Sequence, residues 1–247
     1  MTQTTSWHSP PAQLDLSSDR VQIWQVQLNS QPVEVLRGWL SPDECQRADR
    51  FVRPIDRHSF IAARGILRSL LGGYLHQPPE SIEFGYAERG KPFLAGDSHS
   101  LEFNLSHAGG IALYAFARHR RVGIDVESFR ELDILPLAER FFSDREYRQL
   151  CNYPPTAQPA AFFSLWTAKE ALLKATGEGL LGLSGVEIAL DTDNLIPSIA
   201  MMTSSTSAWY LQSLEVGTGY QGAVAIEGER CPIDCYWYRS KVSSSSG

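Results

Sequence analysis

The chain has 247 residues, of which 43% are hydrophobic and 20% are charged, and its formal net charge is −6. This length allows one large domain or two small ones with a sizeable core. The acidic balance argues against a general nucleic-acid-binding protein, and the absence of a run of about 18 apolar residues argues against a membrane span. Four cysteines are too few for a disulfide framework, and no secretion signal is recognisable, so we expect a reduced cytoplasmic protein.

The first half of the sequence predicts a strand, two helices and three further strands. Alternating residues indicate a strand over 21–28, and Ser41 followed by Pro42 and two acids is typical of a helix start. Apolar residues at helical spacing predict a longer helix from Asp56 to Leu71, ended by Gly72-Gly73. We expect the remaining strands over 81–86, 101–105 and 111–117, with residues 106–110 as a loop.

The second half repeats this order of elements. A strand is predicted over 122–127, a helix start at Ser143, a long helix over 160–176 ended by Gly177, and strands over 186–190, 208–215, 222–226 and 235–238. The succession of short helix, break, long helix and strand therefore occurs twice, about 100 residues apart. We predict an α+β fold with pseudo-twofold duplication, comprising an N-terminal half (1–119), a C-terminal half (122–240) and a disordered tail (241–247).

One segment of this acidic chain is locally basic. Between Glu44 and Arg68 lie six arginines against three acids. The arginines are Arg47, Arg50, Arg53, Arg57, Arg64 and Arg68. This imbalance indicates a confined anion site, and a solvated helix face with ordinary salt bridges is the alternative interpretation.

Two carboxylates follow each other on one face of the strand over 122–127. Because side chains alternate along a strand, Asp125 and Glu127 face one way while Val122, Ile124 and Val126 face the other. Oxygen ligands at this spacing suit Mg²⁺, which takes a few carboxylates and completes its octahedron with water and phosphate oxygens. The alternative is an edge strand whose polar face is exposed to water.

The long helix of the second half carries a third acid and two of the four lysines. Helical spacing places Trp166, Glu170 and Lys174 on one stripe. Glu170 could join the two strand carboxylates around a cation, and Lys169 and Lys174 could offer positive charge to an anionic substrate. The alternative is an exposed helix pair worth a few tenths of a kcal/mol.

The segment around Ser106 and His107 could bind a phosphate. It follows a strand and ends in two glycines, so its backbone N–H groups and the imidazole could face an anion. A polar turn between strands is the alternative, and a turn also accounts for Gly90-Lys91-Pro92.

Taken together, these motifs are far more specific than each alone. The order Phe-Asn-x-Ser-His at 103–107, Gly-Ile-Asp-x-Glu at 123–127 and Trp-x-x-Lys-Glu-Ala-x-x-Lys at 166–174 resembles the 4′-phosphopantetheinyl transferase superfamily. The length and the two-half layout resemble its longer, Sfp-type branch, and the resemblance covers about residues 41–190. It implies a pseudodimer of two α+β halves, with coenzyme A and Mg²⁺ in the cleft between them.

The resemblance also implies an activity and partners. Such a protein transfers the 4′-phosphopantetheine moiety of coenzyme A to a serine of an apo carrier protein and releases 3′,5′-ADP. The carrier could be an acyl, polyketide or peptidyl carrier, and we expect a cytoplasmic monomer that binds neither nucleic acid nor membrane.

Roles for individual residues follow from the resemblance by motif position. The acids of the metal site would be Asp125, Glu127 and Glu170, with Glu170 as the base for the incoming serine, directly or through a water. Lys174 would face the pyrophosphate. The remaining expected contacts to coenzyme A are Ser106, His107, Lys91, Lys169 as a secondary contact, and Arg53 with Arg47 for the 3′-phosphate.

Two alternatives to this enzyme are open. One is a non-catalytic module that binds coenzyme A or a carrier protein, and the intact set of three carboxylates argues against it. The other is a different Mg²⁺-dependent enzyme that cleaves pyrophosphates, and the sequence has neither a P-loop nor a Nudix-like glutamate helix.

Overall fold

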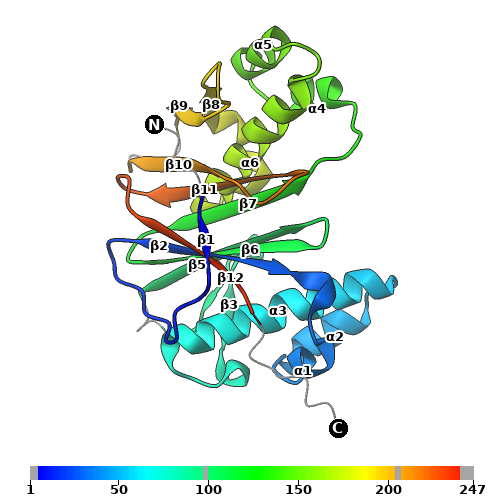
Figure 1. Ribbon diagram of the computed structural model, residues 1–247, viewed down its shortest axis with the longest axis vertical. Helices are drawn as coiled ribbons and strands as arrows, with labels where there is room; N and C mark the ends of the chain where they lie inside the picture. The colour runs from blue at the N-terminus through cyan, green and yellow to red at the C-terminus, as the bar shows by residue number, and fades with distance from the viewer. Residues whose placement is uncertain (1–4, 97–99, 204–206, 240–247) are drawn as a thin grey trace.

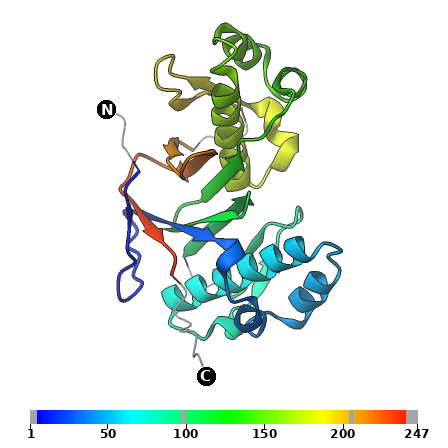
Figure 2. The ribbon, with the colours of Figure 1, turned by 45° about the vertical axis from the view of Figure 1, so that its right-hand side comes forward.

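The computed structural model describes residues 5–96, 100–203 and 207–239. Two β-sheets lie face to face in the middle of the molecule, and a long helix covers the outer side of each (Figures 1 and 2). The strand order of the first sheet is β1 (Trp7–His8), β12 (Ile233–Trp237), β2 (Val21–Gln27), β6 (Ile111–Arg118) and β5 (Leu101–Ala108). The strand order of the second sheet is β10 (Trp209–Leu214), β11 (Tyr220–Glu227) and β7 (Val122–Ser128).

The helices and two small hairpins complete the fold. The helices are α1 (Val33–Arg37), α2 (Pro42–Asp49), α3 (Pro54–Leu75), α4 (Ile134–Phe141), α5 (Asp144–Asn152) and α6 (Gln158–Thr176). One hairpin joins β3 (Phe84–Tyr86) to β4 (Pro92–Leu94), and the other joins β8 (Val186–Leu190) to β9 (Pro197–Met202). Both long helices, α3 and α6, end at a residue in the left-handed conformation, which satisfies a carbonyl of the last turn.

Burial of apolar side chains produces three cores in this layered arrangement. One core lies between α3 and the five-stranded sheet, and a second lies between α6 and the three-stranded sheet. The third joins the two sheets, where Val21 and Leu113 of the first meet Ile124 and Val224 of the second. As the alternation predicted, β7 turns its apolar face into the core between the sheets, so its other face points toward α6.

The two halves repeat the same capping box and the same kind of buried ion pair. Both short helices, α2 and α5, begin with a capping box, formed by Ser41 with Glu44 and by Ser143 with Glu146. Each of these glutamates is buried and paired with a basic residue of the following long helix. Arg68 Nε lies 2.7 Å from Glu44 Oε2, and Lys169 Nζ lies 2.8 Å from Glu146 Oε2. The predicted α+β duplication is confirmed.

The structure differs from the predicted helix end at Gly72. Helix α3 continues through Gly72 and Gly73 to Leu75. A Cβ on Gly72 would lie 2.6 Å from the Gln77 carbonyl oxygen, and one on Gly73 would lie 2.7 Å from the Leu14 side chain. These glycines therefore allow close packing against the helix and do not end it.

The predicted loop over 106–110 is also largely a strand. Strand β5 extends to Ala108, and Ser106 and His107 are paired with Leu113 and Ala112 of β6. The turn consists of Gly109 and Gly110, whose φ values of 56° and 87° fit a two-residue hairpin turn. Because Ser106 and His107 lie in a paired strand, they can offer their side chains to a ligand, but they do not form a loop of free backbone N–H groups.

The last strand returns to the first sheet. Strand β12 pairs in parallel with both β1 and β2, so a segment from the predicted C-terminal range, 122–240, adds a strand to the first sheet. Hydrophobic periodicity identified this strand but could not indicate its partner. The predicted tail, residues 241–247, lies outside the described residues.

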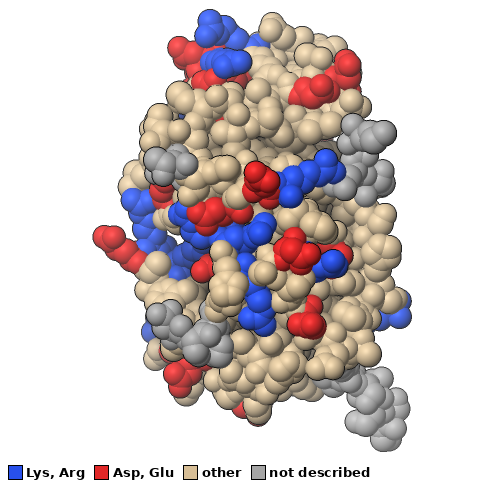
Figure 3. All heavy atoms as spheres, turned by 90° about the vertical axis from the view of Figure 1, so that its left-hand side faces the viewer, with Lys and Arg blue, Asp and Glu red and all other residues tan. Residues whose placement is uncertain are grey.

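The surface mixes charges of both signs. Figure 3 shows acidic and basic side chains beside one another on one face of the molecule. The ion pairs of the described residues include Arg121 with Glu227 at 2.7 Å and Arg20 with Asp234 at 2.9 Å. Within the described ranges, no helix has the length and apolar character needed to cross a membrane.

Candidate active site

The candidate site forms where β5, β7 and α6 meet, at the seam between the two halves. Gly123 on β7 makes this meeting possible, because a Cβ there would collide with the Ala171 carbonyl oxygen and lie 2.5 Å from the Ala175 nitrogen of α6. Asp125 and Glu127 share the face of Gly123. The close approach of helix and strand therefore brings the acids of β7 to the side chains of α6.

Asp125 is the centre of a small hydrogen-bonded triangle. Its side chain is buried, and its Oδ1 accepts hydrogen bonds from Ser106 Oγ at 2.8 Å and from Lys174 Nζ at 2.6 Å. Lys174 Nζ also donates to Ser106 Oγ at 2.9 Å. Three residues that the sequence placed in separate motifs thus meet in one contact.

Glu170 lies near this triangle, one helical turn before Lys174. Burial raises the pKa of Glu170, and the negative charges of Asp125 and Glu127 raise it further, against an opposing effect of Lys174. Burial likewise raises the pKa of Asp125, although Lys174 and Ser106 oppose that shift. Added positive charge would therefore stabilise the ionised form of both carboxyls.

The donor set fits a hard divalent cation. All three acids offer oxygen, which Mg²⁺ prefers, and Asp125 Oδ2 is buried without a hydrogen-bond partner. Glu127 is paired with Arg130 at 2.8 Å. Among the described residues no three acids, histidines or cysteines are gathered into a formed metal centre, and Lys174 holds the other oxygen of Asp125.

Comparisons with known proteins agree with this geometry. A family model described as the 4′-phosphopantetheinyl transferase superfamily matches residues 121–225, and a model of the N-terminal part of 4′-phosphopantetheinyl transferases matches residues 24–119. The chain is 42% identical over 229 residues to the 4′-phosphopantetheinyl transferase HetI of Nostoc sp., which covers 90% of this chain and 94% of the relative. The chain belongs to the 4′-phosphopantetheinyl transferase superfamily.

Other relatives place this transferase in the longer branch. It is 31% identical over 208 residues to Sfp of Bacillus subtilis, covering 84% of this chain and 91% of that protein. It is 33% identical over 193 residues to psf-1 of Bacillus pumilus, covering 78% and 81% of the two chains. The predicted Sfp-type branch and the predicted enzyme, a 4′-phosphopantetheinyl transferase that modifies carrier proteins, are confirmed.

Lys169 of the transferase does not fit the expected contact to coenzyme A. Its side chain is 1% exposed, and Nζ donates to both carboxylate oxygens of Glu146 at 2.8 Å and to the Val186 carbonyl oxygen at 2.6 Å. All three donors of the ammonium are therefore used inside the protein. This corrects the expectation, because a lysine beside a site residue in the sequence lies on a different face of the helix.

The other expected contacts to coenzyme A are spread over the first half of the transferase. The β3–β4 hairpin carries Lys91, whose Nζ donates to the carbonyl oxygens of Lys174 at 2.7 Å and Ala175 at 3.3 Å. His107 lies on β5, and loss of hydration together with the charge of Lys174 lowers its pKa. Burial also lowers the pKa of Lys91.

The two arginines expected at the 3′-phosphate are Arg47 on α2 and Arg53 at the start of α3. Arg53 directly precedes α3, is 74% exposed and pairs with Asp56 at 3.7 Å. The guanidinium of Arg47 lies 5.2 Å from the centre of the Phe60 ring. Arg64 and Arg68 are not available for an anion in the same way, because both pair with the buried Glu44.

Asn104 has a structural role that its motif in the sequence did not predict. This buried side chain accepts a hydrogen bond from the backbone nitrogen of Ile124 at 2.9 Å and thereby joins β5 to β7 across the seam. The contact fixes the relative position of the two strands close to Ser106 and Asp125. Its signal in the sequence is an asparagine between two apolar residues of a strand, Phe103 and Leu105.

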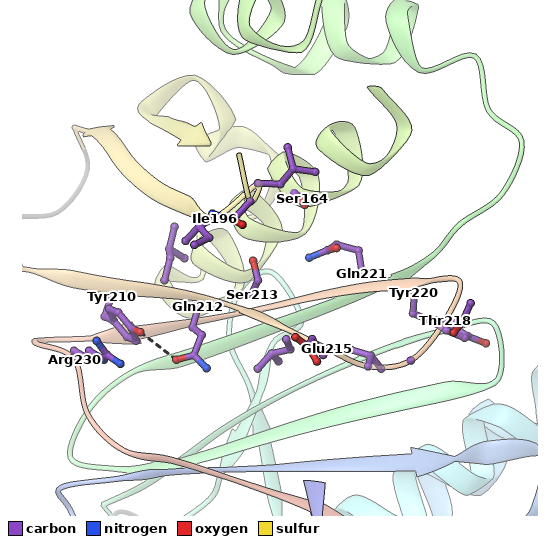
Figure 4. Close-up of a pocket in the computed structure, with 16 residues that line it drawn as sticks. Ser164, Ile196, Tyr210, Gln212, Ser213, Glu215, Thr218, Tyr220, Gln221 and Arg230 are labelled. Atoms are coloured by element: carbon purple, nitrogen blue, oxygen red, sulfur yellow. Dashed lines mark hydrogen bonds between the residues drawn. The ribbon is translucent and has the colours of Figure 1, made fainter. Parts of the chain in front are cut away.

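A separate pocket of about 560 Å³ lies along β10, next to α6 and the β8–β9 hairpin (Figure 4). The residues that line it include Ser164, Ser213, Glu215 and Arg230. Since β10 and β7 are opposite edges of the three-stranded sheet, most of this pocket lies at the other edge from Asp125, although its lining also includes Gln221, which pairs with Glu127. None of the expected site residues lines it.

Proposed function

We propose that Asp125, Glu127 and Glu170 hold Mg²⁺ in this transferase and that Lys174 binds the pyrophosphate of coenzyme A. The observation that carries the proposal is the triangle of Ser106, Asp125 and Lys174, with Glu170 beside it at the seam of the two halves. A bound metal would supply positive charge where the pyrophosphate bond breaks.

The protein's own side chains would do the remaining work. The Lys174 side chain is 30% exposed, so its ammonium can reach a phosphate and stabilise the charge that develops on the leaving group. Glu170 would accept the proton of the carrier serine, directly or through a water. His107, Ser106 and Lys91 would orient coenzyme A, with Arg53 and Arg47 toward the 3′-phosphate.

The partners follow from the same proposal. The reaction would release 3′,5′-ADP and modify a serine of an acyl, polyketide or peptidyl carrier protein. We also propose a monomer in the cytoplasm, where the four free cysteines would stay reduced.

Replacing Asp125 tests the metal assignment. Asp125→Ala should abolish transfer to an apo carrier protein, measured by mass spectrometry as the gain of one phosphopantetheine per carrier. Glu34→Gln, which removes an exposed carboxylate on α1, serves as the matched control and should transfer at the wild-type rate. Transfer by Asp125→Ala at the wild-type rate would show that the assignment is wrong.

A further inference from the structure

The contact between Lys174 and Asp125 places an ammonium where the proposed function needs a divalent cation. Lys174 Nζ lies 2.6 Å from Asp125 Oδ1, while Asp125 Oδ2 is buried and has no partner. A carboxylate that is paired with an ammonium binds a second cation less tightly, because its charge is already neutralised. The two partners of Asp125 would therefore compete.

The charges of the whole cluster lead to the same conclusion. Asp125 and Glu127 share the face of β7 that points toward α6, the helix that carries Glu170, and among the described residues the ion pairs of these acids are Lys174 with Asp125 and Arg130 with Glu127. Arg130 is 51% exposed, whereas the Asp125 side chain is only 6% exposed. Burial makes the pairing of Lys174 with Asp125 the stronger of the two, since water screens the other pair.

Lys174 is also placed so that it can change partners. It lies in the last turn of α6, and its side chain is partly exposed and flexible. Ser106 Oγ accepts one of its hydrogen bonds and remains a polar neighbour when the ammonium moves.

We propose that Lys174 is a placeholder for the metal: its ammonium neutralises Asp125 in the free protein and moves to the pyrophosphate when coenzyme A binds. This inference rests on the proposed function, because it takes Asp125 as a metal ligand and the seam as the coenzyme A site. Its consequence is that the cation binds weakly to the free protein and tightly only together with coenzyme A. By linkage, the cation raises the affinity for coenzyme A by the same factor.

Binding of Mn²⁺ in the absence of coenzyme A tests the placeholder, with electron paramagnetic resonance as the readout. Lys174→Gln should bind Mn²⁺ about tenfold more tightly than the wild type, a factor within the usual range of coupling between sites. Lys174→Arg keeps the charge and should bind Mn²⁺ as weakly as the wild type. Arg130→Gln removes a nearby but exposed charge and should change the affinity less than about threefold.

Two outcomes overturn the placeholder. The first is an equal Mn²⁺ affinity of Lys174→Gln and wild type without coenzyme A. The second is an equal gain in Mn²⁺ affinity in Lys174→Gln and Arg130→Gln. That result would mean that any nearby positive charge weakens metal binding, and that the contact of Lys174 with Asp125 has no special part in it. Lys174→Met provides a second neutral variant, and it should match Lys174→Gln if charge is the cause.

Adding coenzyme A separates failure of the placeholder from failure of the proposed function. If the wild type binds Mn²⁺ tightly with coenzyme A, Asp125→Ala does not, and Lys174→Gln shows no gain in the free protein, only the placeholder is wrong. If Asp125→Ala binds Mn²⁺ as the wild type does under both conditions, the metal assignment itself is wrong, and the placeholder falls with it.

Discussion

Replacing Lys169 by methionine tests whether this lysine serves stability or cofactor binding. The change leaves Glu146, which is fully buried, with two backbone N–H partners, from Ser143 and Ile188, and without a countercharge. Breaking a buried ion pair by removing one partner costs about 3–5 kcal/mol. For a protein of this size each kcal/mol lowers Tm by about 2–4 °C, so Lys169→Met should lower Tm by about 6–20 °C.

Thermal and urea unfolding measure this effect, and the neighbouring pair Arg145–Glu187 supplies the control. Arg145 is 67% exposed, so Arg145→Gln should cost less than about 1 kcal/mol. The double variant Lys169→Met with Glu146→Gln should recover part of the loss, because no charge is then left buried and the amide oxygen can still accept a backbone hydrogen bond.

The kinetics of Lys169→Met complete the test. Below its Tm the variant should keep the wild-type KM for coenzyme A, because Lys169 has no free donor and no exposed surface. A raised KM together with unchanged unfolding would refute the structural role and restore Lys169 as a contact to coenzyme A.

The remaining predictions concern packing, the 3′-phosphate and pH. Gly123→Ala should lower stability by about 1–3 kcal/mol and reduce transfer, because the added Cβ pushes α6 away from β7; unaltered unfolding and transfer would argue against the close approach. Arg53→Gln should raise the KM for coenzyme A without a change in Tm, since the side chain is 74% exposed, and an unchanged KM would remove it from the 3′-phosphate site. Arg121 lowers the pKa of Glu227 to about 2, so this pair stabilises the fold above the ordinary glutamate pKa and loses its effect as the pH falls toward 2. Glu227→Gln should therefore flatten that part of the stability profile in urea unfolding, and an unchanged profile would contradict the shift.

Local signals predicted most of the elements. Ser41 and Ser143 marked both capped helices, and alternation placed Asp125 and Glu127 on the same face of β7. Helical spacing grouped Glu170 with Lys174, and the structure brings this pair to Asp125. These features depend on residues close together in the chain, so periodicity and capping rules suffice for them.

The errors concern contacts between distant parts of the chain. The spacing of Lys169 from Glu170 did not reveal that its partner is Glu146, 23 residues earlier. Gly72 looked like a helix end because the Gln77 carbonyl that it accommodates could not be foreseen. The seam itself depends on Asn104 meeting Ile124, a pairing for which a single sequence contains no distance information.

The return of β12 to the first sheet has a consequence for how the chain folds during synthesis. Because β12 lies between β1 and β2, the strand that joins these two is synthesised more than 200 residues after β2. The N-terminal half must therefore wait with an open sheet edge until the C-terminal half has been made. Two fragments divided near residue 120 should accordingly assemble by strand complementation, in which the C-terminal fragment donates β12 to the sheet of the N-terminal fragment.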